Sequence, residues 1–343
     1  MKPTQNRNLA IDWIKGWMIL CVVLLHTWSL PHFHGHPAVD VFYFICGYFM
    51  MQSRLHHPTT TVSYTWKRIK GIAIPFIISL VVACCMHYNQ FFSLSSLDAV
   101  VDKYAEVFYT FSFAEETGLN TSITRLLFGA WFFSVLIIGS FILYGILEFN
   151  ERLATRILFP LISLFGFSAM ICHADSFSTW THIASLRFPL VRGLAEMAAG
   201  ALICSVYVEH KLAFERHATF INIMGILASI LFVSMLFTQA SFDKFIVITV
   251  PWMLLASAFD GSWLSLGLRK IQGGLISRIG RYTLYILCAH GPAIMLVNRC
   301  NEALLHGSLR GFWLICLDLV STAIATYALY WASKKIRLLF ESK

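Results

Sequence analysis

Long apolar stretches separated by short polar connections run through the whole chain. A helix of about 20 predominantly apolar residues can cross a bilayer, because it satisfies all of its own backbone hydrogen bonds there. Ten stretches are long enough, or nearly so. The pattern therefore predicts an all-α, polytopic membrane protein with about ten transmembrane helices, at residues 11–30, 38–53, 72–92, 126–147, 157–173, 188–208, 219–239, 245–260, 282–299 and 312–333.

Composition agrees with this interpretation. Hydrophobic residues make up 57% of the 343 residues, charged residues make up 13%, and the mean hydropathy is +0.68. An ordinary soluble domain has about 25% charged residues, so a soluble protein is excluded. No repeat, linker or appended soluble domain is visible, and residues 1–343 are expected to form a single membrane-embedded domain. The nine cysteines have no disulfide-framework or metal-ligand spacing and are expected to be buried thiols.

The formal net charge of +8 is distributed as the positive-inside rule predicts for a chain that starts in the cytoplasm. With ten spans, most of the 26 Lys and Arg residues fall at cytoplasmic helix ends and loops, and both termini are expected in the cytoplasm. The positive charge thus reflects membrane topology, and no nucleic-acid partner is expected. In the longest outer loop, at about 93–125, the segment Leu97–Phe113 has mixed polarity and is expected to form an interfacial helix.

Three ionisable residues lie in the first predicted span: Asp12, Lys15 and His26. Each such group at membrane depth costs about 2.5–3.5 kcal/mol on insertion scales, so it tends to persist where it faces a polar cavity or takes part in chemistry. Lys15 and His26 are eleven residues apart. That spacing is about three helical turns, so the two side chains share one face and lie about 16 Å apart along the axis.

The same helix carries the first of five elements that resemble the integral-membrane acyltransferase family 3. The family opens with an Asp, then Leu-Arg-Gly, with ten residues between that Arg and a His. This chain has Asp12, Ile14-Lys15-Gly16 and His26. Four further elements that resemble the family follow in order: Asp40-Val-Phe-Tyr-Phe-Ile-Cys46-Gly47-Tyr48, Trp66-Lys67-Arg68-Ile69-Lys70 ahead of Pro75, Trp131-Phe132-Phe133, and Gly280-Arg-Tyr-Thr-Leu-Tyr-Ile-Leu-Cys-Ala-His290.

The chain departs from the family pattern at three positions. Lys15 replaces the usual arginine, which keeps the charge but loses the bidentate fork. Members that resemble sugar acetylases such as fucose 4-O-acetylase often have lysine at this position, so the chain resembles that branch of the family. Cys46 stands where the family has a serine, and Gly71 stands where the second arginine of an Arg-x-x-Arg pair is usual.

The resemblance implies an O-acetyltransferase of a bacterial inner membrane. It would move an acetyl group from cytoplasmic acetyl-CoA, its cosubstrate, to a hydroxyl of a sugar. The acceptor would belong to a surface polysaccharide or a lipid-linked glycan, and no metal cofactor is implied. The oligomeric state, including a homo-oligomer, stays open.

Within that scheme, the phosphates of CoA require cationic groups on the cytoplasmic side, and four residues qualify: Lys15, Lys67, Arg68 and Lys70. The basic stretch could instead be a plain topology signal. His26 would act as the general base for the acceptor hydroxyl or as a nucleophile that carries the acetyl group, and the sequence leaves both routes open. Asp12 is expected to pair with Lys15 or another basic group at the mouth of the donor site.

Five residues are candidates for binding the acceptor: Asp40, Trp131, Arg187, Arg192 and His290. They also have plain structural interpretations. Asp40 could cap the second helix, and Trp131 could be an interfacial aromatic. Arg192 could be neutralised by Glu196 four residues later, and His290 could simply pack at a helix end.

A histidine-rich segment and the overall helical architecture have other possible interpretations. His32, His34 and His36 alternate in an outer loop, but a fourth ligand is not evident, so we expect no metal site. The alternative function is a transporter or flippase with His26 as a proton site, although the chain shows no paired halves or matched broken helices. A membrane sensor or scaffold would not require cations and a histidine aligned on one helix face.

Overall fold

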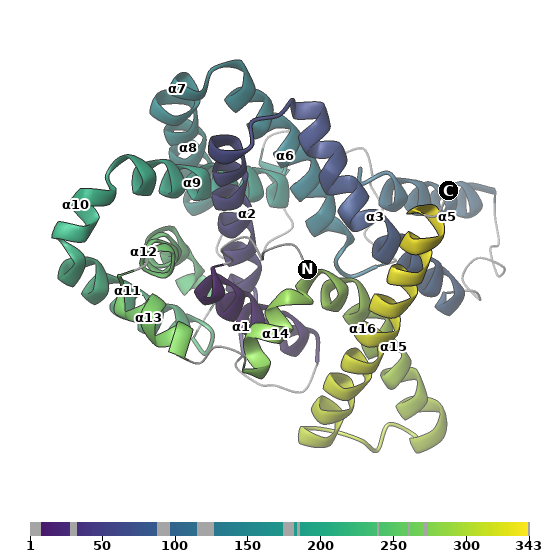
Figure 1. Cartoon of the computed structure of the whole chain (residues 1–343). Coiled ribbons are helices and arrows are strands. Elements are labelled where there is room, and N and C mark those ends of the chain that lie inside the picture. Colours follow the sequence, from purple (N-terminus) through teal and green to yellow (C-terminus); the bar gives the residue numbers. More distant parts are fainter. Residues whose placement is uncertain are drawn as a thin grey trace.

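The structure is a computed structural model that describes residues 8–27, 33–87, 97–114, 127–173, 182–183, 186–238, 240–259, 261–270 and 274–341 (Figure 1). Within these ranges one antiparallel strand pair occurs, in which β1 (His182–Ile183) pairs with β2 (Leu186–Arg187). The other elements are helices: α1 (Leu9–His26), α2 (Pro37–His56), α3 (Thr61–Met86), α5 (Leu97–Phe111), α6 (Ala130–Phe149), α7 (Glu151–Leu153), the π-helix η1 (Ala154–Leu158), α8 (Phe159–His173), α9 (Phe188–Glu209), α10 (Lys211–Arg216), α11 (Ala218–Met235), the 3₁₀-helix η2 (Ala240–Phe245), α12 (Ile246–Ala258), α13 (Trp263–Lys270), α14 (Leu275–Arg281), α15 (Thr283–Leu305) and α16 (Phe312–Glu341).

Seven described helical segments are long and apolar enough to cross a membrane: Leu9–His26, Thr61–Met86, Ala130–Phe149, Glu151–Cys172, Phe188–Glu209, Ala218–Met235 and Phe312–Phe340. The other three predicted spans are helices too, namely α2, α12 and α15. Helix α12 has only 13 residues, while α2 and α15 contain polar residues such as Asp40 and His290. The chain is therefore an all-helical, polytopic membrane protein, which confirms the predicted fold class.

Helix α3 begins well before the predicted span at 72–92. Thr60 caps its N-terminus, because the Thr60 side-chain oxygen accepts a hydrogen bond from the backbone N–H of Ser63 (3.3 Å). The predicted span at 72–92 leaves the basic residues Lys67 and Arg68 in a connecting loop before it, whereas the structure places both on α3. That expectation was wrong because hydropathy marks only the apolar part of a helix, whereas Lys and Arg also favour helical structure.

Helices α2 and α9 pack with their backbones in contact. A Cβ atom on Gly47 would lie less than 3.0 Å from backbone atoms of Met197, and one on Gly200 less than 3.0 Å from the Phe44 carbonyl oxygen. Small residues at such crossings let membrane helices approach closely, which is the main source of attraction between them in lipid. The α2–α9 pair is thus closely packed, and α6 and α8 pack against α9 beside it (Figure 1).

Glycines also allow α14 to lie against the first half of α1 (Figure 1). A Cβ atom on Gly16 would meet the backbone of Ile276, and one on Gly280 would meet the Asp12 carbonyl oxygen. The first half of α1, which carries Asp12, is therefore covered by a short helix far away in the sequence.

Helix α16 runs beside α15 and α3 and donates a hydrogen bond to α3 where a proline interrupts the α3 backbone hydrogen bonds (Figure 1). Pro75 lies inside α3 and has no backbone N–H, so the Gly71 carbonyl four residues earlier loses its intrahelical partner. Arg337 of α16 donates a hydrogen bond from Nη2 to this oxygen (3.0 Å). A long-range contact therefore satisfies the group that the proline leaves without a partner.

Candidate functional site

The structure brings His26 together with His290. His26 is the last residue of α1 and is half-buried, while His290 lies on the third turn of α15 and is 1% exposed. Their ring centroids are 5.2 Å apart, with the planes tilted by 36°. The ring of Phe128 also stacks on His26, at a centroid distance of 5.1 Å and an interplanar angle of 9°. Two imidazoles from opposite ends of the sequence thus share one small space.

The local backbone determines the tautomer of His290. Its Nδ1 faces two carbonyl oxygens of its own helix, those of Leu287 (2.9 Å) and Ile286 (3.2 Å). Both partners are acceptors, so Nδ1 carries the hydrogen and donates it. Nε2 is then the acceptor nitrogen, and it has no hydrogen-bond partner among the described residues.

A buried charged cluster connects α2 and α9. Asp40, in the first turn of α2, pairs with Arg192 of α9: Arg192 Nε lies 3.2 Å from Asp40 Oδ1, and both side chains are at least nine-tenths buried. Glu196, one turn further along α9, is fully buried and interacts electrostatically with both groups. Two acidic side chains thus surround one guanidinium.

This arrangement changes two expectations. The ion pair that holds Arg192 crosses between helices to Asp40, and the expected neutralisation by Glu196 is only part of its environment. Asp40 does not cap α2, because the N-cap residue is His36 and the helix begins at Pro37. A cap must precede the first turn, whereas Asp40 lies within it and faces the neighbouring helix.

Aromatic and basic groups complete this end of the site. The Arg192 guanidinium lies over the Trp131 ring at 5.3 Å, and Trp131 is half-buried at the start of α6. Arg187 is the N-cap residue of α9 and is also half-buried. The structure therefore groups Trp131 with Asp40 and Arg192, and it places Arg187 about one turn before Arg192 on the same chain segment.

His36 links the histidine pair to the charged cluster. Burial, the positive charge of Arg192 and the imidazoles of His26 and His34 together lower the pKa of His36 to about 4. His36 therefore lies within electrostatic range of both groups. His32 lies outside the described residues, and within the described part of the chain no three His, Cys, Asp or Glu residues are arranged to hold a metal ion.

A second set of groups lies three turns earlier on α1. Lys15 Nζ is 3.0 Å from Asp12 Oδ1, and the Asp12 carboxyl is 4% exposed, so the predicted ion pair is confirmed. Lys15 also lies within electrostatic range of Cys46 on α2. Because Lys15 and His26 both lie on the continuous helix α1, their spacing places the cation on nearly the same face as His26.

Arg68 points from α3 into the same region. It donates a hydrogen bond from Nη1 to the Ser140 hydroxyl oxygen (2.8 Å) and another from Nη2 to the Cys46 carbonyl oxygen (3.2 Å). Its guanidinium also lies over the Tyr64 ring at 5.1 Å. Arg68 therefore joins α2, α3 and α6, and both Arg68 and Lys15 lie within electrostatic range of Cys46.

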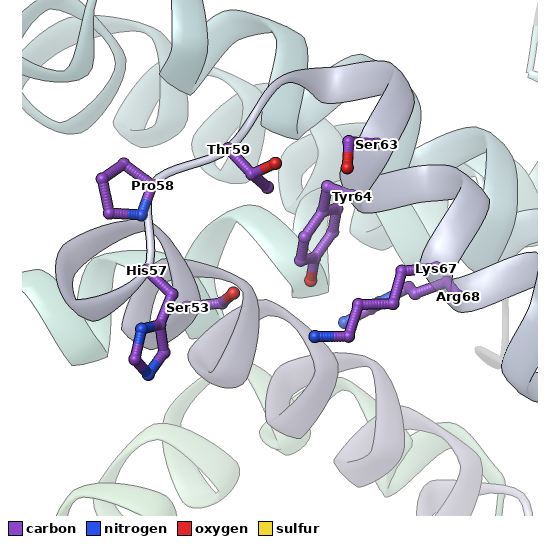
Figure 2. Close-up of a pocket in the computed structure, with 8 residues that line it drawn as sticks. All are labelled: Ser53, His57, Pro58, Thr59, Ser63, Tyr64, Lys67 and Arg68. Atoms are coloured by element: carbon purple, nitrogen blue, oxygen red, sulfur yellow. The ribbon is translucent and has the colours of Figure 1, made fainter.

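An open pocket of about 600 Å³ lies beside Arg68. Figure 2 shows Lys67 and Arg68 extending from α3 toward the end of α2, with Tyr64 beside them. The lining residues come from the end of α2, the following turn and the start of α3: Ser53, His57, Pro58, Thr59, Ser63, Tyr64, Lys67 and Arg68. This volume is in the range of small-molecule sites, which is about 300–1,000 Å³.

Sequence reasoning found the two cations of this pocket but missed its other walls. Ser53, His57 and Tyr64 belong to no motif, and only the turn between α2 and α3 brings them together. Lys70, by contrast, is outside the lining; it is exposed, with its ammonium 5.4 Å from the centre of the Trp66 ring. The position along α3 explains the difference, because Lys70 lies about 4.5 Å further along the helix axis than Lys67, away from the turn that forms the pocket.

Comparison with known proteins gives one match. A family model described as an acyltransferase domain matches residues 8–331, nearly the whole chain. No curated protein and no solved structure matches the chain.

Proposed function

The chain belongs to the acyltransferase 3 family of membrane proteins, and on that premise we propose that it is an acetyl-CoA-dependent sugar O-acetyltransferase. Family membership makes it a membrane acyltransferase with an acyl donor and an acceptor. The finer proposal is that acetyl-CoA from the cytoplasm donates the acetyl group to a sugar hydroxyl. The acceptor would be a surface polysaccharide or lipid-linked glycan at a bacterial inner membrane, and the chain would resemble the fucose 4-O-acetylase-like branch.

One observation supports this proposal most strongly: α1 connects a cationic region to a half-buried histidine. Lys15 and the pocket with Lys67 and Arg68 lie toward one end, and His26 with His290 lies toward the other. CoA carries several phosphates and cannot cross a bilayer unaided, so its binding groups must be cationic and cytoplasmic. The positive-inside pattern assigns this end of α1 to the cytoplasm.

The donor would bind with its phosphates at the open pocket (Figure 2). Lys67 is exposed there and can meet a phosphate directly, whereas Arg68 is held by Ser140 and Cys46 and keeps positive charge at the inner wall. Lys15, oriented by Asp12, would bind further along the path toward His26. Lys70, exposed beside Trp66, would contribute only at long range.

The acceptor would bind at the cluster of Asp40, Arg192 and Trp131. An aromatic face suits the apolar side of a sugar ring, and charged groups suit its hydroxyls. Arg187 and Arg192 would also suit an anionic acceptor or the diphosphate of a lipid carrier. Arg192 of this cluster and His26 both lie within electrostatic range of His36, which supports a path for an acceptor hydroxyl from the cluster to the catalytic imidazole.

Two chemical routes fit this arrangement. In direct transfer, His26 takes the proton of the acceptor hydroxyl while its oxygen attacks the thioester carbonyl carbon. The C–S bond then breaks, and the CoA thiolate takes the proton from His26. In the covalent route, a nitrogen of His26 attacks the thioester carbonyl carbon first, the C–S bond breaks, and CoA leaves as the thiol with the proton that the imidazole loses. The acetyl-imidazole then transfers its acetyl group to the acceptor hydroxyl, and the hydroxyl proton returns to the imidazole. Acetylated His26, trapped by rapid quenching without acceptor, would identify the second route.

The first test is acetyl-CoA binding and hydrolysis by the purified protein. We expect His26→Ala to bind acetyl-CoA normally and to lose turnover, and Lys15→Ala to lose affinity as well as turnover. Lys67→Ala should also weaken binding, more strongly at low salt, because a phosphate contact is screened by ions. Lys70→Ala is the matched control, with the same charge change three residues away outside the pocket lining.

The same assay distinguishes the acyltransferase from the alternative function, a transporter or flippase. A protein that binds no acetyl-CoA, but moves a glycan or metabolite across vesicles without changing its mass, would be a transporter, with His26 as a proton site. Equal acetylation by wild type and His26→Ala in cells at equal protein level would refute the catalytic role of His26.

A further inference from the structure

We propose that His290 is the positioning partner of His26: its Nε2 accepts the N–H of the His26 imidazole, so that the other nitrogen of His26 keeps its lone pair for acyl transfer. This inference rests on the proposed function and adds a second histidine to it. Neither the family match nor the first-helix motif assigns such a role to His290.

The orientation of His290 is the first step of the argument. Two hydrogen bonds to the carbonyls of Leu287 and Ile286 hold Nδ1–H against its own helix. Nε2 lies on the opposite side of the imidazole, away from these carbonyls. Because the Nδ1 proton is engaged, the neutral ring can only accept a hydrogen bond at Nε2.

The second step is the cost of leaving that nitrogen without a partner. His290 is 1% exposed, and its Nε2 has no hydrogen-bond partner among the described residues. An unsatisfied buried acceptor costs about 1–3 kcal/mol. A leucine of similar size would avoid that cost, so packing alone does not explain a histidine here. The imidazole of His26 lies beside it, at a centroid separation of 5.2 Å.

The third step is the packing that keeps the two rings together. Phe128 stacks on His26 at 9° and so restricts the tilt of that imidazole. The same Phe128 packs against Gly291, the neighbour of His290, where a Cβ atom would lie 3.1 Å from its ring. One phenylalanine thus contacts the His26 ring and the backbone beside His290, which fixes their relative positions.

Among the described contacts, no carboxylate is placed to orient His26. Acyl-transfer enzymes commonly orient a catalytic histidine with an aspartate. Here the buried carboxyls of Asp40 and Glu196 surround Arg192. A neutral imidazole can perform the orienting part of that task, because a hydrogen bond at one nitrogen determines which nitrogen holds the proton.

The variants His290→Leu and His290→Gln test this role. We expect His290→Leu to lower kcat by about 100-fold, the lower range for a misplaced general base, with an unchanged KM for acetyl-CoA. His290→Gln should recover part of kcat, because its amide oxygen can replace Nε2 as an acceptor. The melting temperature of His290→Leu should equal or exceed that of the wild type. A lower melting temperature with intact kcat would assign His290 to packing and overturn the proposal.

A double-mutant cycle adds a readout that a structural role would not give. If His290 acts through His26, then His290→Leu should have no further effect on residual turnover in the His26→Ala background. Multiplicative effects of the two changes would overturn the proposal.

Chemical acylation separates this inference from the proposed function. Diethyl pyrocarbonate acylates neutral imidazole nitrogens, and mass spectrometry can follow it at His26 with the exposed His56 as internal reference. We expect His290→Leu to slow modification of His26 relative to His56, whether or not acetyl-CoA is the donor. If the wild type ignores acetyl-CoA but His26 still depends on His290, only the proposed function fails. Equal His26 reactivity in both proteins would overturn the inference alone.

Discussion

Replacing Gly47 with alanine tests whether the close approach of α2 and α9 keeps the buried charged cluster assembled. The added Cβ atom would lie less than 3.0 Å from backbone atoms of Met197. A backbone group cannot rotate away as a side chain can, so the two helices must move apart. Overpacking of this kind costs about 1–3 kcal/mol.

The displacement reaches the proposed acceptor site because the same two helices carry Asp40 and Arg192. Their contact is 3.2 Å long, and even a small separation of α2 from α9 weakens it. Because both groups are buried, the loss adds to the packing cost. We therefore expect Gly47→Ala to lower the melting temperature and to raise the KM for the acceptor more than the KM for acetyl-CoA.

The assay is thermal unfolding in detergent alongside steady-state acetyl transfer, with Gly71→Ala as the matched control. No atom lies within 4 Å of a Cβ atom built on Gly71, which is also inside a helix. Alanine there should be neutral or stabilising by up to about 1 kcal/mol, because it favours helix over the unfolded chain. If Gly47→Ala unfolds and turns over like Gly71→Ala, the helices tolerate separation and the reasoning is wrong.

Three further predictions concern stability. Because burial and nearby cations lower the pKa of His36 to about 4, the folded protein keeps this residue neutral, while the unfolded chain protonates it near pH 6.5. Its contribution to the free energy of unfolding should therefore be complete above pH 6.5 and fall by about 1.4 kcal/mol per pH unit down to about pH 4. His36→Gln should remove that component from a pH series of melting curves. Arg337→Ala should lower the free energy of unfolding by about 1–2 kcal/mol, because it leaves the Gly71 carbonyl oxygen without a partner. The cost should be smaller in a Pro75→Ala background, where the restored backbone N–H can donate to that oxygen, and equal costs in both backgrounds would contradict this account. Arg156→Ala removes an ion pair whose side chains are 61% and 37% exposed, so it should lower the free energy of unfolding by less than about 1 kcal/mol. Arg192→Leu leaves buried acidic groups uncompensated and should lower it by about 3–5 kcal/mol. Chemical denaturation measures both, and similar costs would show that burial does not matter here.

Local pattern was sufficient for the helices and for the alignment along α1. Helix formation and membrane insertion depend on contiguous residues, so hydropathy located a helix at each of the ten predicted spans. The spacing of Asp12, Lys15 and His26 determined their relative positions, because a helix converts sequence distance directly into direction and height. Hydropathy failed at the start of α3, since polar residues that extend a helix contribute no apolar signal.

Only the tertiary structure decided which distant side chains meet. The sequence contains His26 and His290, but it does not state that α15 brings them within 5.2 Å of each other. It suggested Glu196 as the partner of Arg192 because that pair is local, whereas the packing of α2 on α9 supplied Asp40. Likewise, Arg337 reaches Gly71 from another helix. Such contacts depend on how helix faces fit together, and no short stretch of sequence encodes that fit.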